Sequence, residues 1–196
     1  MLDKSVPYFD LAMHRRAGTP LPSALLPPGY SLVAFQPGDE AAWATIETAV
    51  LEFSSETKAR QYFCEQYLGC IEEARRRVFF VRTPEGDKVG TTTVWWTYTG
   101  KQRVVELHWV GLKPEYQGKG IGKAMVALAM QECLEIEGEV DVYLHTQTWS
   151  YLAIGIYLQV GFKLMPEGSY GRHKNSYHAA LPVLRSKMSA DTLALI

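Results

Sequence analysis

The sequence has few cysteines, no long apolar run and almost no net charge over its 196 residues. Three cysteines do not form a disulfide framework, and none stands in a Cys-x-x-Cys pair or at metal-ligand spacing from histidines. The longest strongly apolar stretch, residues 124–130, is far shorter than the roughly 20 residues that cross a bilayer. We therefore expect a protein of the reducing cytoplasm, with no metal and no membrane partner.

No charge of one sign is in surplus, because 20 Lys and Arg stand against 21 Asp and Glu. Binding to nucleic-acid phosphates requires a local excess of positive charge. The three arginines at residues 75–77 are the best candidate for such a basic patch, but a run of this kind is more often the solvated end of a helix. The balance therefore disfavours a nucleic-acid partner, and the 47% share of hydrophobic residues excludes intrinsic disorder.

The length predicts one domain with an appendage. Five prolines lie in residues 1–29, and proline interrupts regular structure because it lacks a backbone N–H. We expect a proline-rich N-terminal arm over residues 1–29, without a regular element across most of it and docked on the domain. The domain itself is expected over residues 30–185, followed by a C-terminal tail over residues 186–196.

The periodicity of apolar residues predicts an α/β protein built on one mixed sheet. Three consecutive runs with short turns predict an antiparallel meander. Strands are expected at residues 30–36, 78–82, 88–98, 103–112, 140–145, 162–165 and 175–181. Helices are expected from Asp39 to about 53, from 56 to about 77, after the glycines to about 138, and over 150–160.

A glycine-rich turn, residues 117–123, stands between a predicted strand and a predicted helix. Glycine permits close approach of a ligand to the backbone, and a helix start presents free N–H groups and a positive dipole end. These features suit phosphate or pyrophosphate. The spacing fails both for a P-loop, because Lys123 stands where glycine is required, and for a dinucleotide fingerprint, because Gly122 comes one position early. A merely flexible helix entry explains one glycine better than three.

Two motifs resemble the GCN5-related N-acetyltransferases. Residues 117–122 read Q-G-K-G-I-G and are similar to that family's Q/R-x-x-G-x-G/A signature. Residues 150–162 read S-x-x-A-x-x-I-Y-x-x-x-G-F and are similar to its second motif, N-x-x-A-x-x-L-Y-x-x-x-G-F. The motifs occur in the right order, and the predicted elements from residue 30 to residue 181 agree with the family.

The resemblance implies a fold with a mostly antiparallel, splayed central sheet flanked by helices, and acetyl-CoA as cosubstrate. The pantetheine arm would pair with the backbone of Val110 and Leu112 where the strands at 104–112 and 140–145 separate. Ser150, which replaces the usual asparagine, would contact it more weakly. The pyrophosphate would rest on the turn, Gln117, Gly118, Lys119, Gly120, Ile121, Gly122 and Lys123.

The same resemblance assigns Tyr157 as the general acid toward the sulfur, which suits a phenol that stays protonated at neutral pH. A tyrosine that only packs in the core is the alternative. Glu106 matches the base of the histone-acetyltransferase branch, and strand alternation puts it on one face with His108 and Val110. An exposed strand glutamate is the alternative there, while His108 and then His145 are further candidate bases.

The sequence thus predicts an N-acetyltransferase that acts on a primary amine of a small molecule, peptide or protein. A non-catalytic acyl-CoA-binding regulatory domain is the alternative. The acceptor site is expected among the early helices, the strand with Trp95 and Trp96, and the final strands, where aromatic walls would suit a cationic or apolar amine. His173 and His178 are a poor metal pair without acidic or cysteine ligands. A homodimer stays open.

Overall fold

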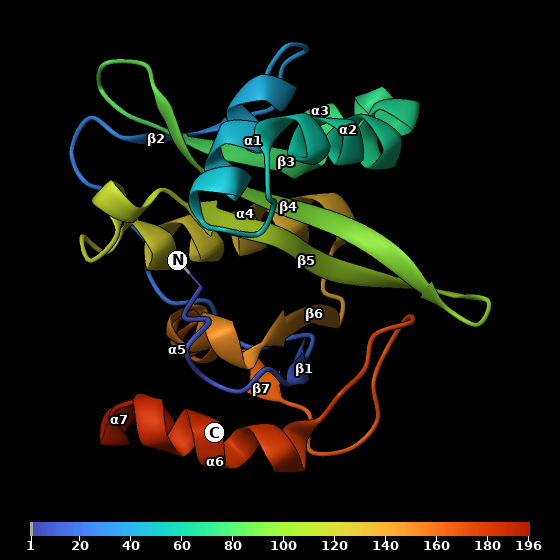
Figure 1. Cartoon of the computed structure of the whole chain (residues 1–196). Helices are drawn as coiled ribbons and strands as arrows, with labels where there is room; N and C mark the ends of the chain where they lie inside the picture. The colour runs from blue at the N-terminus through green and yellow to red at the C-terminus, as the bar shows by residue number, and fades with distance from the viewer. Residues whose placement is uncertain (1) are drawn as a thin grey trace. The chain divides into compact units, whose positions relative to one another are not determined.

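The computed structural model describes residues 2–196. Within this range the strands form a seven-stranded sheet in the order β2-β3-β4-β5-β6-β1-β7; Figure 1 labels the strands and helices. The strands are β1 (Asp10–Arg15), β2 (Ser31–Ala34), β3 (Val78–Arg82), β4 (Lys88–Thr99), β5 (Gln102–Leu112), β6 (Val142–Gln147) and β7 (Lys163–Leu164). The α-helices are α1 (Glu40–Ala49), α2 (Glu56–Tyr67), α3 (Ile71–Arg77), α4 (Ile121–Glu137), α5 (Tyr151–Gln159), α6 (Tyr177–Lys187) and α7 (Ala190–Leu193). Three 3-10 turns are η1 (Leu68–Cys70), η2 (Pro114–Tyr116) and η3 (Thr148–Ser150).

The chain divides into two compact units. The described part of the first comprises residues 23–94 and 109–133, and the second comprises residues 2–22, 95–108 and 134–196. The division falls within β4 and β5, so each of these strands contributes residues to both units. No helix in the described residues has the length and apolar character needed to cross a membrane.

The first unit is built on the antiparallel pairs β2–β3 and β3–β4. Ile121 and Met125, one turn apart on α4, pack with Val81 of β3 and Val89 of β4 in a buried cluster. Because Ile121 is the first residue of α4, this packing fixes the helix start and with it the end of the glycine-rich turn.

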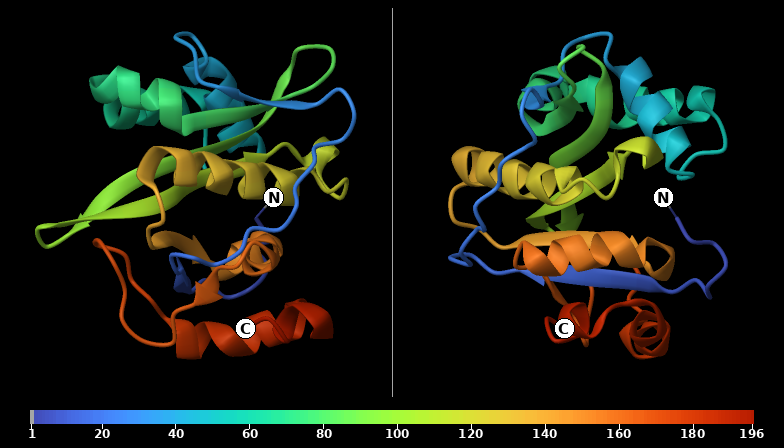
Figure 2. Two further views of the ribbon diagram at one scale, coloured as in Figure 1. Left: turned by 180° about the vertical axis from the view of Figure 1, so that it is seen from behind. Right: turned by 90° about the vertical axis from the view of Figure 1, so that its left-hand side faces the viewer.

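The second unit contains an N-terminal strand that the sequence analysis did not predict. Strand β1 pairs antiparallel with β6 along its whole length and with β7 at Met13 and His14 (Figure 2). Its flanking prolines, Pro7 and Pro20, lie outside the strand and so remove no ladder hydrogen bond. The expectation of no regular element across most of residues 1–29 missed this strand, because the residues between the prolines are free to pair.

The predicted closing strand at residues 175–181 is wrong, since α6 covers most of it. Ala180 and Leu184, one helical turn apart, are both fully buried on the face that α6 turns inward. The short run offered no complete helical period before Pro182, which favoured the strand interpretation. Residues 186–196, expected as a tail, include the end of α6 and all of α7.

Two predicted helices also differ from the structure. The helix expected over 56–77 is interrupted at η1, which contains Gly69, and resumes as α3. Asp39 does not cap α1 with its side chain; its carboxylate instead accepts from the Gln36 N–H at 2.8 Å and pairs with Lys88. Helix α1 ends at Ala49, four residues before the expected end.

The expectation of a mixed, mostly antiparallel sheet is confirmed.

Candidate functional site

The glycine-rich turn in the first unit is open where a ligand would approach. Gly118 and Gly120 have φ values of 74° and 78°, in the left-handed region that favours glycine. A Cβ atom at either position would have no atom within 4 Å. Both glycines are exposed.

Three contacts fix the turn between β5 and α4. The Gln117 side chain donates to the Leu112 carbonyl at 2.8 Å, and Lys119 Nζ donates to the Glu115 carbonyl at 2.9 Å. The Ala124 N–H donates to the Gly120 carbonyl at 3.2 Å. The N–H groups of residues 121–123 precede this first helical bond, so the helix itself supplies no acceptor for them. Gln117 and Lys119 thus hold the shape of the turn at the start of α4.

Strand β5 changes its backbone geometry at Trp109, which has a φ of 49°. Such a value is uncommon for a bulky residue and breaks the strict two-residue alternation of a strand. The predicted common face of Glu106, His108 and Val110 depended on that alternation, which Trp109 interrupts between His108 and Val110. The Trp109 indole is held in place by donating to the Tyr62 hydroxyl at 3.1 Å.

The two strands expected to separate do so in the second unit. Strand β5 is parallel to β6 at the pairs Val105–Val142 and Glu106–Tyr143. Among the described residues of this unit, the register does not continue to Leu107 or His108. The strands thus separate directly after Glu106, as the splayed sheet requires.

Glu106 is a buried carboxylate with a histidine beside it. It is 5% exposed, and its Oε2 lies 3.7 Å from His173 Nε2. Burial raises its pKa, but the interactions of its carboxylate with His173, His108 and Tyr170 together outweigh burial, so its pKa is lowered. Glu106 is therefore ionised at neutral pH, and the exposed-glutamate alternative does not describe it.

Histidines surround this carboxylate. Burial lowers the pKa of His108 to about 4, against the opposing effect of Glu106. His145 stacks on His173, with ring centroids 4.4 Å apart, and its Nε2 lies 3.1 Å from Asp10 Oδ1. Burial and the charge of His173 lower the pKa of His145 against the effect of Asp10. Both His108 and His145 are consequently neutral imidazoles at pH 7.

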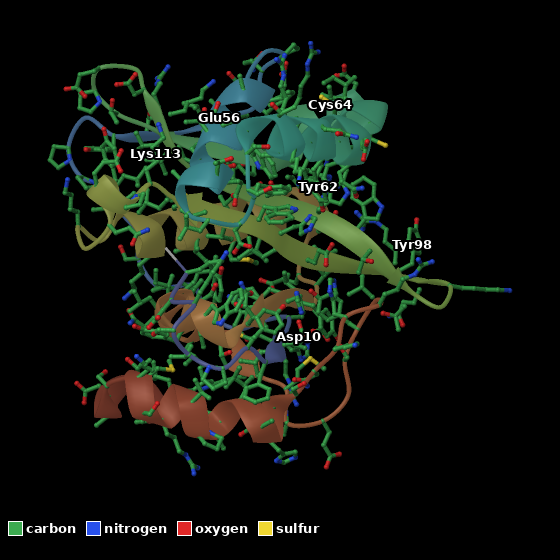
Figure 3. All side chains as sticks on the ribbon, viewed as in Figure 1. Asp10, Glu56, Tyr62, Cys64, Tyr98 and Lys113 are labelled. Atoms are coloured by element: carbon green, nitrogen blue, oxygen red, sulfur yellow. The ribbon has the colours of Figure 1, made fainter. Side chains whose placement is uncertain are left out.

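Sequence reasoning missed two partners in this cluster and misread a third. Asp10 comes from β1, where Figure 3 labels it, and Tyr170 and His173 come from the loop before α6. Burial and the charge of Glu106 raise the pKa of Tyr170. His173, considered only as a metal ligand with His178, contacts Glu106 and His145 instead. Separations of up to 135 residues left no local signal for these contacts.

Tyr157 and Ser150 lie in and before α5 in the second unit. Tyr157 is 7% exposed and packs edge-on against Phe162, with ring centroids 6.2 Å apart. Ser150 directly precedes α5 and makes no side-chain capping bond to it. The N-terminal segment anchors this region, because Thr148 Oγ1 accepts from the Phe9 N–H at 2.9 Å and Trp149 Nε1 donates to the Val6 carbonyl at 2.8 Å.

Comparisons with known proteins agree with this architecture. The family model described as the Acetyltransferase (GNAT) family matches residues 40–162. A mycothiol acetyltransferase of Streptomyces coelicolor is 28% identical over 149 residues, which are 74% of this chain and 46% of that protein. The mycothiol acetyltransferase of Renibacterium salmoninarum is 30% identical over 152 residues, 74% of this chain and 44% of that protein. The chain thus spans less than half the length of these relatives.

Solved structures share the fold at lower identity. A GCN5-related N-acetyltransferase from Sphaerobacter thermophilus has a TM-score of 0.61 at 20% identity, covering 80% of this chain and 48% of that one. An acetyltransferase of the GNAT family from Colwellia psychrerythraea has a TM-score of 0.58 at 14% identity, covering 81% of this chain and 54% of that one.

Proposed function

Because the chain belongs to the acetyltransferase (GNAT) family, we propose that it transfers an acetyl group from acetyl-CoA to the primary amine of a small molecule or peptide. The observation that carries this proposal is the buried, ionised Glu106, beside neutral His108 on the strand that leads to the glycine-rich turn. The three cysteines are free thiols, which fits the cytoplasmic location that we propose with it.

The turn residues fit the anionic end of acetyl-CoA. The pyrophosphate would be held by the backbone at Gly118 and Gly120 and by the amides of residues 121–123, with Gln117 and Lys119 supporting the turn. The pantetheine arm would follow the backbone of Val110 and Leu112, with Ser150 as a weak polar contact. Acetyl-CoA supplies an activated thioester, so binding both reactants in one orientation supplies much of the rate.

Two proton transfers fall to side chains of the second unit. Glu106 takes the proton that the amine must lose before it attacks the thioester, either directly or through a water molecule. His173, whose side chain is 31% exposed, lies 3.7 Å from Glu106 and can pass that proton to solvent. His108 is the second candidate base, whereas His145 orients His173 by stacking on it. Tyr157 donates a proton to the departing sulfur.

The acceptor is an open part of the proposal. The relatives named above are mycothiol acetyltransferases, so the deacetylated form of mycothiol belongs in the amine panel to be tested. Because the chain covers less than half of those proteins, simple primary amines and peptide amino termini belong beside it.

The test is acetyl-CoA-dependent thiol release with that panel, comparing the wild-type protein with Glu106→Gln and Tyr157→Phe. Loss of a general base or acid lowers kcat by about 100-fold to 10,000-fold while coenzyme A binding is retained. Asp141→Asn, an exposed change beside His14, is the control and should leave kcat unaltered. Thiol release that survives Glu106→Gln undiminished would remove Glu106 from the mechanism. Binding of coenzyme A without thiol release from any amine would favour the non-catalytic acyl-CoA-binding domain.

A further inference from the structure

The N-terminal strand β1 places a carboxylate beside the histidines around Glu106. Asp10, labelled in Figure 3, is the first residue of β1 and lies opposite Gln147 of β6 in the strand pairing. Its side chain is half-buried, and its Oδ1 lies 3.1 Å from Nε2 of His145 on β6. Strand β1, these histidines and Glu106 all belong to the second unit.

The contact with Asp10 determines the tautomer of His145. Burial lowers the pKa of His145 and keeps the ring neutral at pH 7, and a neutral imidazole carries a single N–H. An ionised carboxylate has no proton to donate, so Nε2 of His145 is the donor in this pair. The same Oδ1 also accepts from the Tyr8 hydroxyl at 2.8 Å. The carboxylate thus fixes both the proton and the orientation of the His145 ring.

The fixed ring of His145 supports the ring of His173. The two imidazoles stack with centroids 4.4 Å apart and planes inclined by 14°. His173 Nε2 in turn lies 3.7 Å from Glu106 Oε2. Tyr170 packs against His173 as well, with ring centroids 5.0 Å apart. A series of contacts therefore runs from Asp10 through His145 and His173 to Glu106.

The loop that carries His173 is also attached to β1. It lies between β7 and α6 and forms neither helix nor strand. The Asp10 carbonyl accepts from the Ser176 N–H at 2.8 Å, and Asn175 Oδ1 accepts from the Ala12 N–H at 3.4 Å. These bonds fix the loop backbone, whereas the imidazole ring of His173 is oriented by its ring contacts.

The charges in this region separate two possible effects of Asp10 on Glu106. The titratable side chains around the Glu106–His173 contact come from β5, β6, β1 and the loop before α6: His108, Tyr143, His145, Asp10 and Tyr170. Asp10 carries the same charge as Glu106, so loss of that charge alone can only lower the pKa of Glu106. Loss of the His173 contact would raise it, because burial would then be opposed by fewer partners.

We propose that Asp10 is a positioning residue for the base Glu106: its carboxylate fixes His145, and the stacked ring of His145 holds His173 beside Glu106. The inference rests on the proposed function for the statement that Glu106 takes a proton from the amine. That proton passes from Glu106 to His173 and then to water, which returns both groups to their starting state. The N-terminal strand is thereby part of the apparatus that regenerates the base.

Nuclear magnetic resonance of the protein alone tests the positioning. The 13C shift of the Glu106 carboxyl follows its titration, and the nuclear Overhauser effect between the rings of His145 and His173 reports the stack. Asp10→Ala should abolish the Overhauser effect and move the titration to higher pH, as His173→Asn does. The double variant should move it no further. Asp10→Asn, whose amide oxygen still accepts from His145, should keep the Overhauser effect and should not raise the titration.

Asp141 offers a matched control on the same pair of strands. Its Oδ2 lies 3.1 Å from Nε2 of His14 on β1, and His14 stacks on Tyr143 rather than on His173. Asp141→Ala therefore removes a carboxylate from a histidine without touching the proposed series of contacts. It should leave the Overhauser effect and the Glu106 titration as in wild type. With an accepted amine, the acidic limb of kcat/KM should move to higher pH in Asp10→Ala and stay in place in Asp141→Ala.

The outcomes separate this inference from the proposed function. A titration of Glu106 in Asp10→Ala at or below the wild-type pH, or an Overhauser effect that persists, would overturn the inference. If thermal melting shows that Asp10→Ala does not fold, the Glu106 titration in His145→Ala decides instead, because that variant removes the same support and leaves β1 unaltered. A raised titration in a protein that acetylates no amine would support the positioning by Asp10 and count against the proposed function alone.

Discussion

At the residue scale, two buried glutamates have opposite pKa shifts for a physical reason. Burial without a hydrogen-bond partner, and then the negative charge of Glu52, raise the pKa of Glu47. Glu106 is buried too, but His173, His108 and Tyr170 stabilise its carboxylate and lower its pKa. Its surroundings thus favour the protonated form of the side chain in one unit and the carboxylate in the other.

The raised pKa of Glu47 predicts a pH-dependent loss of stability. Above the pKa of an unfolded glutamate, near 4.3, the unfolded chain releases a proton that folded Glu47 retains. The free energy of unfolding therefore falls as pH rises, by up to about 1.4 kcal/mol per pH unit, until folded Glu47 also ionises. Glu47→Gln should remove this slope and be more stable than wild type at pH 7. Urea unfolding from pH 4 to 8 measures both proteins, and identical pH profiles would contradict the burial argument.

The contact between His173 and Glu106 predicts a shift in the pH–rate profile. Without His173, burial dominates and the pKa of Glu106 rises, so more of the base is protonated at mildly acidic pH. For His173→Asn, the acidic limb of kcat/KM against pH should move to higher pH. His178→Asn, which alters an exposed histidine on α6, should leave the limb in place. If both variants retain the wild-type profile, His173 does not control the protonation of Glu106.

At the element scale, α5 contains a glycine that packing tolerates rather than requires. A Cβ atom on Gly155 would lie 3.4 Å from Thr192 Cγ2, an ordinary van der Waals contact. Since alanine in a helix interior is more favourable than glycine by about 0.5–1 kcal/mol, Gly155→Ala should raise the free energy of unfolding by that amount. Gly161→Ala, two residues after α5, should lower it, because its Cβ would lie 2.7 Å from Thr19 Cγ2. Urea unfolding of both variants checks the two predictions. A destabilised Gly155→Ala would show that α5 packs too closely at Gly155 to admit a methyl group.

The glycine-rich turn predicts how coenzyme A affects stability. Coenzyme A at about 100 times its Kd should add roughly 2.7 kcal/mol to the free energy of unfolding. Gly120→Val should abolish this gain, because a β-branched residue is strained at a φ of 78° and covers the open backbone. Gly100→Val, which strains the turn between β4 and β5 in the same way, is the control and should keep the gain. Thermal unfolding with and without coenzyme A measures the stabilisation. If coenzyme A stabilises Gly120→Val as much as the wild-type protein, its phosphates bind elsewhere.

At the scale of the whole molecule, local patterns predicted the central elements better than the ends. The periodicity of residues 78–112 and the helix after the glycines correspond to β3, β4, β5 and α4, and the family expectation is confirmed. Strand β1 was missed because its pairing with β6 spans more than 120 residues. The sequence predicted only part of the cluster around Glu106. Glu106 and His108 stand on one predicted strand, whereas the remaining members reach the cluster only through tertiary folding. These are Asp10, Tyr170 and His173. The unpartnered state of Glu47 has no sequence signature at all.

The most direct test of the central claim is mass spectrometry of amines incubated with the full chain and isotopically labelled acetyl-CoA. We predict that at least one primary amine of the panel gains the labelled acetyl group on nitrogen, and that Glu106→Gln reduces the yield strongly while still binding coenzyme A. Thermal stabilisation by coenzyme A together with unlabelled amines across the whole panel would contradict the account and identify the chain as a binding domain.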